Sequence, residues 1–281
     1  MGDLLLRLQR LDRRVIYAVL AVGVAVPLLL YSIMPVTVSP TTRSLYEAIE
    51  RIPKDKIVIL SVDWDAATRG ENEPQTEAVI RHLMKRGIRF GIISFINPWG
   101  PQFGELVARR VAKELGKRYG EDWVNFGYIT GGAIVLRSFV LCPDIISFLK
   151  DKDAHGRRLR DMPVMRGIKD FSDVAMVVEF TGGGGLEDWI AFANGLKGTP
   201  IGHGCTAVIA PRRYQFIDSG QLEGMLVGLV GAAEYRALVD RRLPKLLQKM
   251  VNSQSVAHAL IILFIALGNA GYFVARRRGL S

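Results

Sequence analysis

Cysteine and histidine are scarce in this chain, and their scarcity excludes two classes of protein. The 281 residues contain two cysteines, Cys142 and Cys205, and four histidines. Two cysteines are too few for a disulfide-held scaffold, and no Cys and His spacing typical of a metal site occurs. The two thiols could pair with each other outside the cytoplasm or stay separate, because sequence gives no distance between them.

Charge is missing from two long stretches near the ends of the chain. Residues 15–34 and 256–275 contain no Asp, Glu, Lys or Arg. Roughly 20 apolar residues cross the ~30 Å hydrocarbon layer of a bilayer, so we expect two transmembrane helices, 15–34 and 256–275. The first apolar run is longer than the ~7–15 residues usual in a cleaved signal peptide, which favours an uncleaved anchor.

The arginines around the first span predict its orientation. Arg7, Arg10, Arg13 and Arg14 precede it, whereas Arg43 is the nearest basic residue after it. Because basic residues stay inside, we expect a cytoplasmic amino terminus. Two spans then place both termini in the cytoplasm of an inner or plasma membrane protein and the central domain outside it.

These features divide the chain into seven expected segments. In order, they are a cytoplasmic interfacial helix (1–14), the first span (15–34), a linker with a short helix (35–55), an extracytoplasmic α/β domain (56–240), a basic juxtamembrane segment (241–255), the second span (256–275) and a cytoplasmic tail (276–281).

The net charge of +10 is spread over these segments rather than concentrated in one patch. Residues 1–14 hold four Arg and two Asp, or +2, and the three arginines after residue 275 add +3, which leaves +5 for everything between. We therefore expect no nucleic-acid partner. The basic residues beside the spans favour membrane lipid as a partner instead.

The central domain alternates apolar strands with helices. We expect strands at 56–63, 88–95, 123–128, 173–181 and 203–210, and helices at 74–86, 102–119, 142–149 and 186–196. The stretch 133–139 fits a short helix or a strand. Such alternation is typical of right-handed βαβ crossovers, so we predict an α/β fold, a mostly parallel, Rossmann-like, doubly wound sheet of five or six strands.

A glycine-rich turn follows the strand at 173–181. It comprises Gly182, Gly183, Gly184 and Gly185, directly after Glu179 and Thr181, while Gly131 and Gly132 follow another strand. Open α/β sheets bind ligands at the carboxyl ends of their strands, so these residues form a candidate ligand-binding edge, with tight packing as the alternative. Buried Glu179 is a candidate for a perturbed pKa, and we interpret His203 and Cys205 as core residues.

Two carboxylates stand at the end of the first strand. The stretch from Val62 to Thr68, with Asp63 and Asp65 two apart, resembles the first motif of haloacid-dehalogenase-type phosphatases, and Ser94 stands where that family places a hydroxyl. The resemblance covers only these residues. It implies catalytic Asp63, Asp65 and Ser94 with Mg²⁺; the alternative is that the two aspartates accept backbone hydrogen bonds in a loop.

Small residues recur every four positions near the end of the domain. We expect a helix at 219–239, on which Gly220, Gly224, Gly228 and Ala232 form one stripe. Such a stripe lets another backbone approach closely. The stripe would serve either as an oligomer interface or as packing against the domain's own sheet.

Taken together, the sequence favours a non-catalytic, membrane-anchored binding or scaffold subunit of a homo-oligomer or of a complex with other membrane proteins, without a cofactor. One alternative is a membrane-bound, metal-dependent, phosphatase-like hydrolase built on Asp63 and Asp65. Another is a sensor of a small ligand at the glycine-rich edge.

Overall fold

The structure is a computed structural model that describes residues 12–30, 37–241 and 243–277. The chain divides into two compact units. One unit comprises residues 36–242, and the other combines residues 1–35 with residues 243–281.

The larger unit is built on a sheet of six parallel strands in the order β3-β2-β1-β4-β5-β6. This arrangement confirms the predicted parallel α/β sheet. The strands are β1 (Ile57–Val62), β2 (Arg89–Ser94), β3 (Trp123–Tyr128), β4 (Val174–Thr181), β5 (Ile201–Cys205) and β6 (Gly224–Val227).

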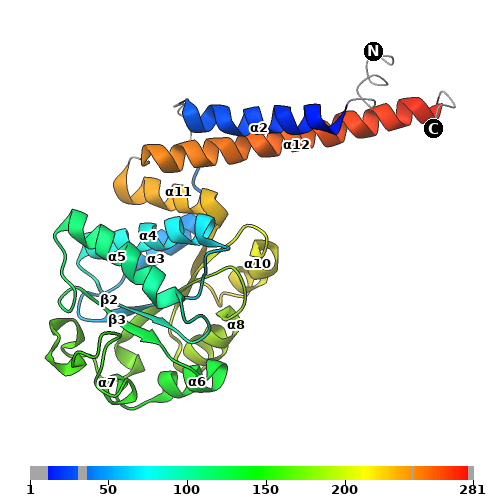
Figure 1. The fold of residues 1–281 in the computed structure, drawn as a ribbon. Coiled ribbons are helices and arrows are strands. Elements are labelled where there is room, and N and C mark those ends of the chain that lie inside the picture. Colours follow the sequence, from blue (N-terminus) through cyan, green and yellow to red (C-terminus); the bar gives the residue numbers. More distant parts are fainter. Residues whose placement is uncertain (1–11, 31–36, 242, 278–281) are drawn as a thin grey trace. The chain divides into compact units, whose positions relative to one another are not determined.

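Helices cover both faces of this sheet (Figure 1). One face packs against α3 (Pro40–Glu50), α4 (Arg69–Arg86), α5 (Gly100–Leu115) and α11 (Gly228–Asp240). The other packs against α6 (Gly132–Leu141), α7 (Ile145–Phe148), α10 (Ala210–Asp218) and the continuous helical segment made of α8 (Leu186–Trp189), the π-helical turn η4 (Ile190–Asn194) and α9 (Gly195–Lys197). Three short 3₁₀ turns, η1 (Leu159–Asp161), η2 (Pro163–Met165) and η3 (Phe171–Asp173), precede β4.

The apolar runs explain the two-sided burial. In β1, Val58 and Leu60 enter one core cluster while Ile57 and Ile59 enter the other. A strand buried on both faces reads as a continuous apolar run, which made β1 to β4 predictable. Gly87 ends α4 with φ of +67°, as expected for a glycine after a helix, and the ambiguous stretch 133–139 lies in α6.

The predicted helix at 219–239 is correct from Gly228 onward and wrong before it. Residues Gly224–Val227 form β6, and the helix begins only at Gly228. Gly224 lies against α3, where an added Cβ would stand 2.3 Å from the Leu45 backbone nitrogen. The predicted stripe of small residues therefore does not form, because Gly224 lies in a strand and not in a helix; its four members are Gly220, Gly224, Gly228 and Ala232. The missing side chain at Gly224 lets β6 pack closely against α3 instead.

The predicted strand at 203–210 is also too long. β5 ends at Cys205, and the next helix, α10, begins at Ala210. Pro211 stands in the first turn of α10, a position where its missing N–H costs no hydrogen bond. A proline that we interpreted as the end of a strand is thus the start of a helix.

The smaller unit contains two antiparallel helices, α2 (Arg13–Leu29) and α12 (Lys245–Arg277). Ser253 Oγ donates to the Val24 carbonyl at 3.0 Å, and Lys249 Nζ donates to the Leu29 carbonyl at 3.2 Å. From the first contact to the second, the residue number rises along α2 and falls along α12. The two helices therefore pair in an antiparallel arrangement.

Within the described ranges, α12 is the one helix long and apolar enough to cross a membrane. Helix α2 has 17 residues and contains Pro27. Residues 1–11 and 31–34, which belong to the predicted interfacial helix and first span, lie outside the described residues. The structure thus supports one apolar span by length and composition.

Replacing Gly224 with Ala tests the packing of β6 against α3. We expect Gly224→Ala to lower the free energy of unfolding by about 1–3 kcal/mol, because backbone atoms of α3 cannot move aside as a flexible side chain can. Chemical denaturation of the full chain in detergent, followed by tryptophan fluorescence, measures the change.

Gly70→Ala is the matched control, since no atom lies within 4 Å of a Cβ added there and the residue is helical. It should leave stability unchanged or raise it slightly. Equal stability of the two variants would contradict the close approach of β6 and α3.

Candidate functional site

The strand order places the topological switch point between β1 and β4. From β1 the chain proceeds to β2 and β3 in one direction, and from β4 to β5 and β6 in the other. In open α/β sheets, ligands usually bind in the crevice between the loops that leave the strands at this point. Here those loops follow Val62 and Thr181.

The loops at the switch point pack against each other. A Cβ added to Gly182 would lie 2.3 Å from Thr68 Cγ2, and one added to Gly100 would lie 1.7 Å from the Val62 carbonyl oxygen. Asn97 Nδ2 also donates to the Trp64 carbonyl at 2.9 Å. These contacts hold the loops at the switch point close to each other.

Asp63 and Ser94, two of the predicted catalytic residues, are brought together. The Ser94 hydroxyl donates to Asp63 Oδ1, and the Ser61 hydroxyl donates to Asp63 Oδ2 at 2.6 Å. Trp189 Nε1 in turn donates to Ser61 Oγ at 3.0 Å. Burial, followed by the nearby Glu179 carboxyl, raises the pKa of Asp63 to about 7.

Asp65 does not join this cluster. Its side chain accepts a hydrogen bond from the Ala67 amide at 2.8 Å and is exposed, whereas Asp63 is buried. The chain leaves the sheet after Val62, so the alternation of a strand no longer applies at Asp65. Among the described residues, no group of three His, Cys, Asp or Glu side chains is placed to hold a metal ion.

Glu179 and His203 form a second buried pair. They are register partners on β4 and β5, both have no exposed surface, and His203 Nδ1 lies 3.1 Å from Glu179 Oε2. Neither ring nitrogen and neither carboxyl oxygen makes a hydrogen bond within the described ranges. Burial raises the pKa of Glu179 well above its ordinary value and lowers the pKa of His203 to about 3, so the neutral form of each group is favoured more strongly here than in water.

The glycine-rich turn packs against Glu179, one member of this pair. A Cβ added to Gly185, which has φ of +117°, would stand 2.5 Å from Glu179 Oε1. Thr181 Oγ1 accepts from the Gly183 amide at 3.0 Å and donates to the Gly184 carbonyl at 3.3 Å, which fixes the shape of the turn. Glycine is required at 185 both for its backbone angle and for this close approach.

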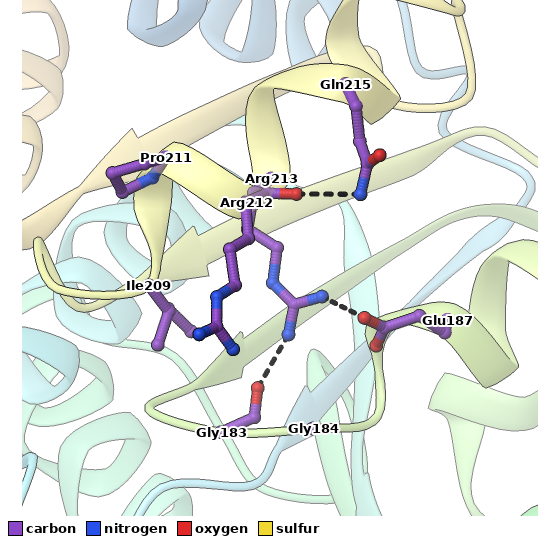
Figure 2. Close-up of a pocket in the computed structure, with 8 residues that line it drawn as sticks. All are labelled: Gly183, Gly184, Glu187, Ile209, Pro211, Arg212, Arg213 and Gln215. Atoms are coloured by element: carbon purple, nitrogen blue, oxygen red, sulfur yellow. Dashed lines mark hydrogen bonds and ion pairs between the residues drawn. The ribbon is translucent and has the colours of Figure 1, made fainter.

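A pocket of about 600 Å³ opens beside the turn (Figure 2). Figure 2 shows Arg212 and Arg213 extending from α10 toward the turn, where Arg213 Nη2 donates to the Gly183 carbonyl at 2.7 Å and its Nη1 pairs with Glu187. The pocket thus lies between the turn after β4 and helix α10, which follows β5, and so one strand away from the switch point. Its lining is Gly183, Gly184, Glu187, Ile209, Pro211, Arg212, Arg213 and Gln215.

Gly131 and Gly132 lie at the same carboxyl edge but belong to the loop after β3. Gly131 precedes α6 with φ of +119°, and Gly132 has φ of +56°. Neither residue lines the pocket beside Gly183. The predicted ligand-binding edge therefore separates into a glycine turn at the pocket and a glycine pair that starts a helix.

Sequence reasoning missed the arginines and two buried amides. Arg212 and Arg213 follow the strand predicted at 203–210, and no helix was predicted there. Asn72 and Gln75 lie in α4 and are fully buried, with side chains that bond to carbonyls at the ends of β4, β5 and β6. The sequence did contain one indication of the two amides: Asn72, Gln75 and Thr76 lie on the same side of the helix, at spacings of three and four residues.

Comparison with known proteins found no relative of this chain. No protein-family model matches the chain, and no curated protein and no solved structure matches it either. The site is therefore interpreted from its own geometry.

Asp63→Asn should flatten the pH dependence of stability. Because the folded-state pKa of about 7 lies above the ordinary value of 3.8, the folded protein keeps a proton that the unfolded chain loses in this range. Stability contributed by Asp63 is therefore full below about pH 4 and falls as pH rises toward 7, by up to about 1.4 kcal/mol per pH unit.

Urea unfolding at several pH values between about 4 and 7 measures this slope, and the slope should be smaller in Asp63→Asn than in the wild type. Asp65→Asn changes an exposed side chain at the same loop and serves as the control. An unchanged slope in Asp63→Asn would contradict the assignment.

Proposed function

We propose that this protein is a membrane-anchored, non-catalytic binding protein whose α/β domain holds a small anionic ligand in the pocket beside Gly183 and Gly184. The observation on which the proposal rests is the presence of two arginines in a pocket of about 600 Å³ at the carboxyl edge of the sheet. This proposal joins the binding-subunit and small-ligand sensor hypotheses from the sequence.

The charge of the pocket favours an anion. Arg213 is buried and neutralises Glu187, whereas Arg212 is exposed and lines the same pocket. Two arginines against one carboxylate leave one positive charge for the ligand. A guanidinium donates paired hydrogen bonds to carboxylate and phosphate oxygens, so the ligand class is a small molecule with either group.

The membrane anchor is the second part of the proposal. Helix α12 has the required length and composition, and its apolar side chains are largely exposed, with Ile262, Ile265 and Phe273 more than half exposed. Exposed apolar surface of this extent needs lipid or a partner protein to cover it. Antiparallel pairing of α2 with α12 supports a second span formed by residues 15–34, with membrane lipid around both.

The proposed topology follows from the same antiparallel pair. Arg13 and Arg14 begin α2, Arg276 and Arg277 end α12, and basic residues favour the cytoplasmic side. Both termini would then lie in the cytoplasm and the α/β domain outside. Assembly with a second copy or with other membrane subunits would use the exposed apolar sides of the spans.

The hydrolase hypothesis has less support from the geometry. Asp63 and Ser94 lie together, but both oxygens of Asp63 already accept hydroxyl groups. Asp65 accepts a backbone hydrogen bond instead, as in the structural alternative considered for it. A binding function uses the pocket that is open, whereas hydrolysis would need these contacts to rearrange.

Arg212→Ala should weaken anion binding about tenfold or more while leaving the fold intact, because one charged hydrogen-bond donor is worth roughly 1.5–3 kcal/mol. Titration calorimetry of the full chain in detergent, with sulfate and with acetate as probes, measures the change. Arg118→Ala, an exposed arginine paired only with Glu121 among the described residues, is the control. Equal affinity in both variants would contradict the pocket assignment.

The two native cysteines report the topology. Cys142 is partly exposed and Cys205 is fully buried, and both are free thiols. In sealed vesicles that present the outer membrane face, a membrane-impermeant maleimide should label the wild type and should fail to label Cys142→Ser. A Ser281→Cys change made in Cys142→Ser should be labelled only after the vesicles are opened. The reverse pattern would place the domain in the cytoplasm.

A further inference from the structure

The buried pair of Glu179 and His203 plays no part in the binding scheme described above. Four polar atoms of this pair are enclosed without a hydrogen bond among the described residues. Unpaired buried polar atoms are costly, roughly 1–3 kcal/mol each, and uncommon in folded proteins. A function that needs both groups explains why they are placed together.

Resting on the proposed ligand pocket, we propose that anion binding beside Arg212 and Arg213 is accompanied by uptake of one proton, which the Glu179 carboxyl holds against His203. The protein would thus bind an acid as anion plus proton. The binding affinity would then depend on the pH of the compartment that the domain faces.

The geometry connects the pair to the pocket through a single turn. Gly183 and Gly184 line the pocket, and the next residue, Gly185, lies against Glu179 Oε1. On its other side Glu179 faces His203 Nδ1 at 3.1 Å, a distance at which a carboxyl O–H can donate to a neutral imidazole nitrogen after a small rotation. The proton therefore has a place between two atoms that the fold already brings together.

Arg213 makes the two events interdependent. It is committed to Glu187 and to the Gly183 carbonyl, and its Nε is buried without a hydrogen-bond partner within the described ranges. An ionised Glu179 would attract this guanidinium and repel an anion in the pocket. Protonation of Glu179 removes both effects, so an anion and a proton bind more favourably together than either does alone.

Other charged groups face the pair from the elements around it. Their contributions must be separated by experiment. The α8 segment contributes Glu187 and Asp188, α10 contributes Arg213, the loop after β1 contributes Asp63, and near Cys205 on β5 lies Glu71 of α4.

Calorimetry of sulfate binding to the full chain in detergent tests the linkage. Sulfate keeps one charge state from about pH 5 to pH 9, so any proton exchanged belongs to the protein. Titrations in two buffers with different ionisation enthalpies give the number of protons taken up. We expect up to one proton per sulfate in the wild type, and an affinity that falls up to tenfold per pH unit above the pKa of Glu179 in the unliganded protein.

Glu179→Gln should bind sulfate with no proton uptake and with an affinity that does not change with pH. Asp63→Asn and Asp188→Asn are controls, because each removes another nearby carboxyl, and both should keep the uptake. Binding without proton uptake in the wild type, or uptake that survives in Glu179→Gln, overturns the linkage and leaves the pocket assignment standing. Absence of sulfate binding at every pH overturns the pocket and the linkage together.

Discussion

The carbonyl groups at the ends of β4, β5 and β6 need hydrogen-bond donors, and two amide side chains of α4 supply them. Gln75 Nε2 donates to the carbonyls of Cys205, at 2.8 Å, and of Gly228, at 2.9 Å. Asn72 Nδ2 contacts the carbonyls of Thr181 and Gly204 at longer range, 3.4 and 3.3 Å. Carbonyl groups at buried strand ends cannot reach water, so they need donors from within the protein. The side chains of Asn72 and Gln75 supply these donors and hold the ends of the strands next to Glu179, His203 and the pocket.

The loops at the switch point lie close together beside the start of α4. With α4 held against the ends of β4 and β5, Thr68 at its start packs on Gly182 and closes the loops after β1 and β4. The pocket lies on the side of the glycine turn that faces α10. The pocket beside Gly183 lies at the carboxyl ends of β4 and β5, whereas the strand order alone points to the loops after β1 and β4.

The sequence predicted the parts of the molecule that depend on local pattern. Apolar runs gave β1 to β4 and the α/β class, and Asp63 and Ser94 were correctly placed near each other because they end neighbouring parallel strands. The helix expected at 219–239 failed because Gly224 and Gly228 fit either a helix stripe or a strand against a helix. Only the position of α3, distant in sequence, decides between the two.

The missed site residues share one cause, which is that their partners are distant in sequence. Arg213 stabilises the turn through Gly183 and Glu187, 30 and 26 residues away. Gln75 reaches carbonyls at least 130 residues away. Patterns of neighbouring residues contain no information about such pairs, whereas the glycines that permit the pairs to form are visible in the sequence.

Gly185 shows how the fold and the proposed chemistry depend on each other. Its missing side chain lets the turn come within contact distance of the Glu179 carboxyl and exclude water from it. Shielding from water raises the pKa of this carboxyl, so Glu179 takes up a proton more readily than an exposed glutamate would, beside a pocket that holds arginines. A Cβ at residue 185 would meet Glu179 Oε1 at 2.5 Å, so the burial of the acid and the course of the turn beside the pocket both depend on this one glycine.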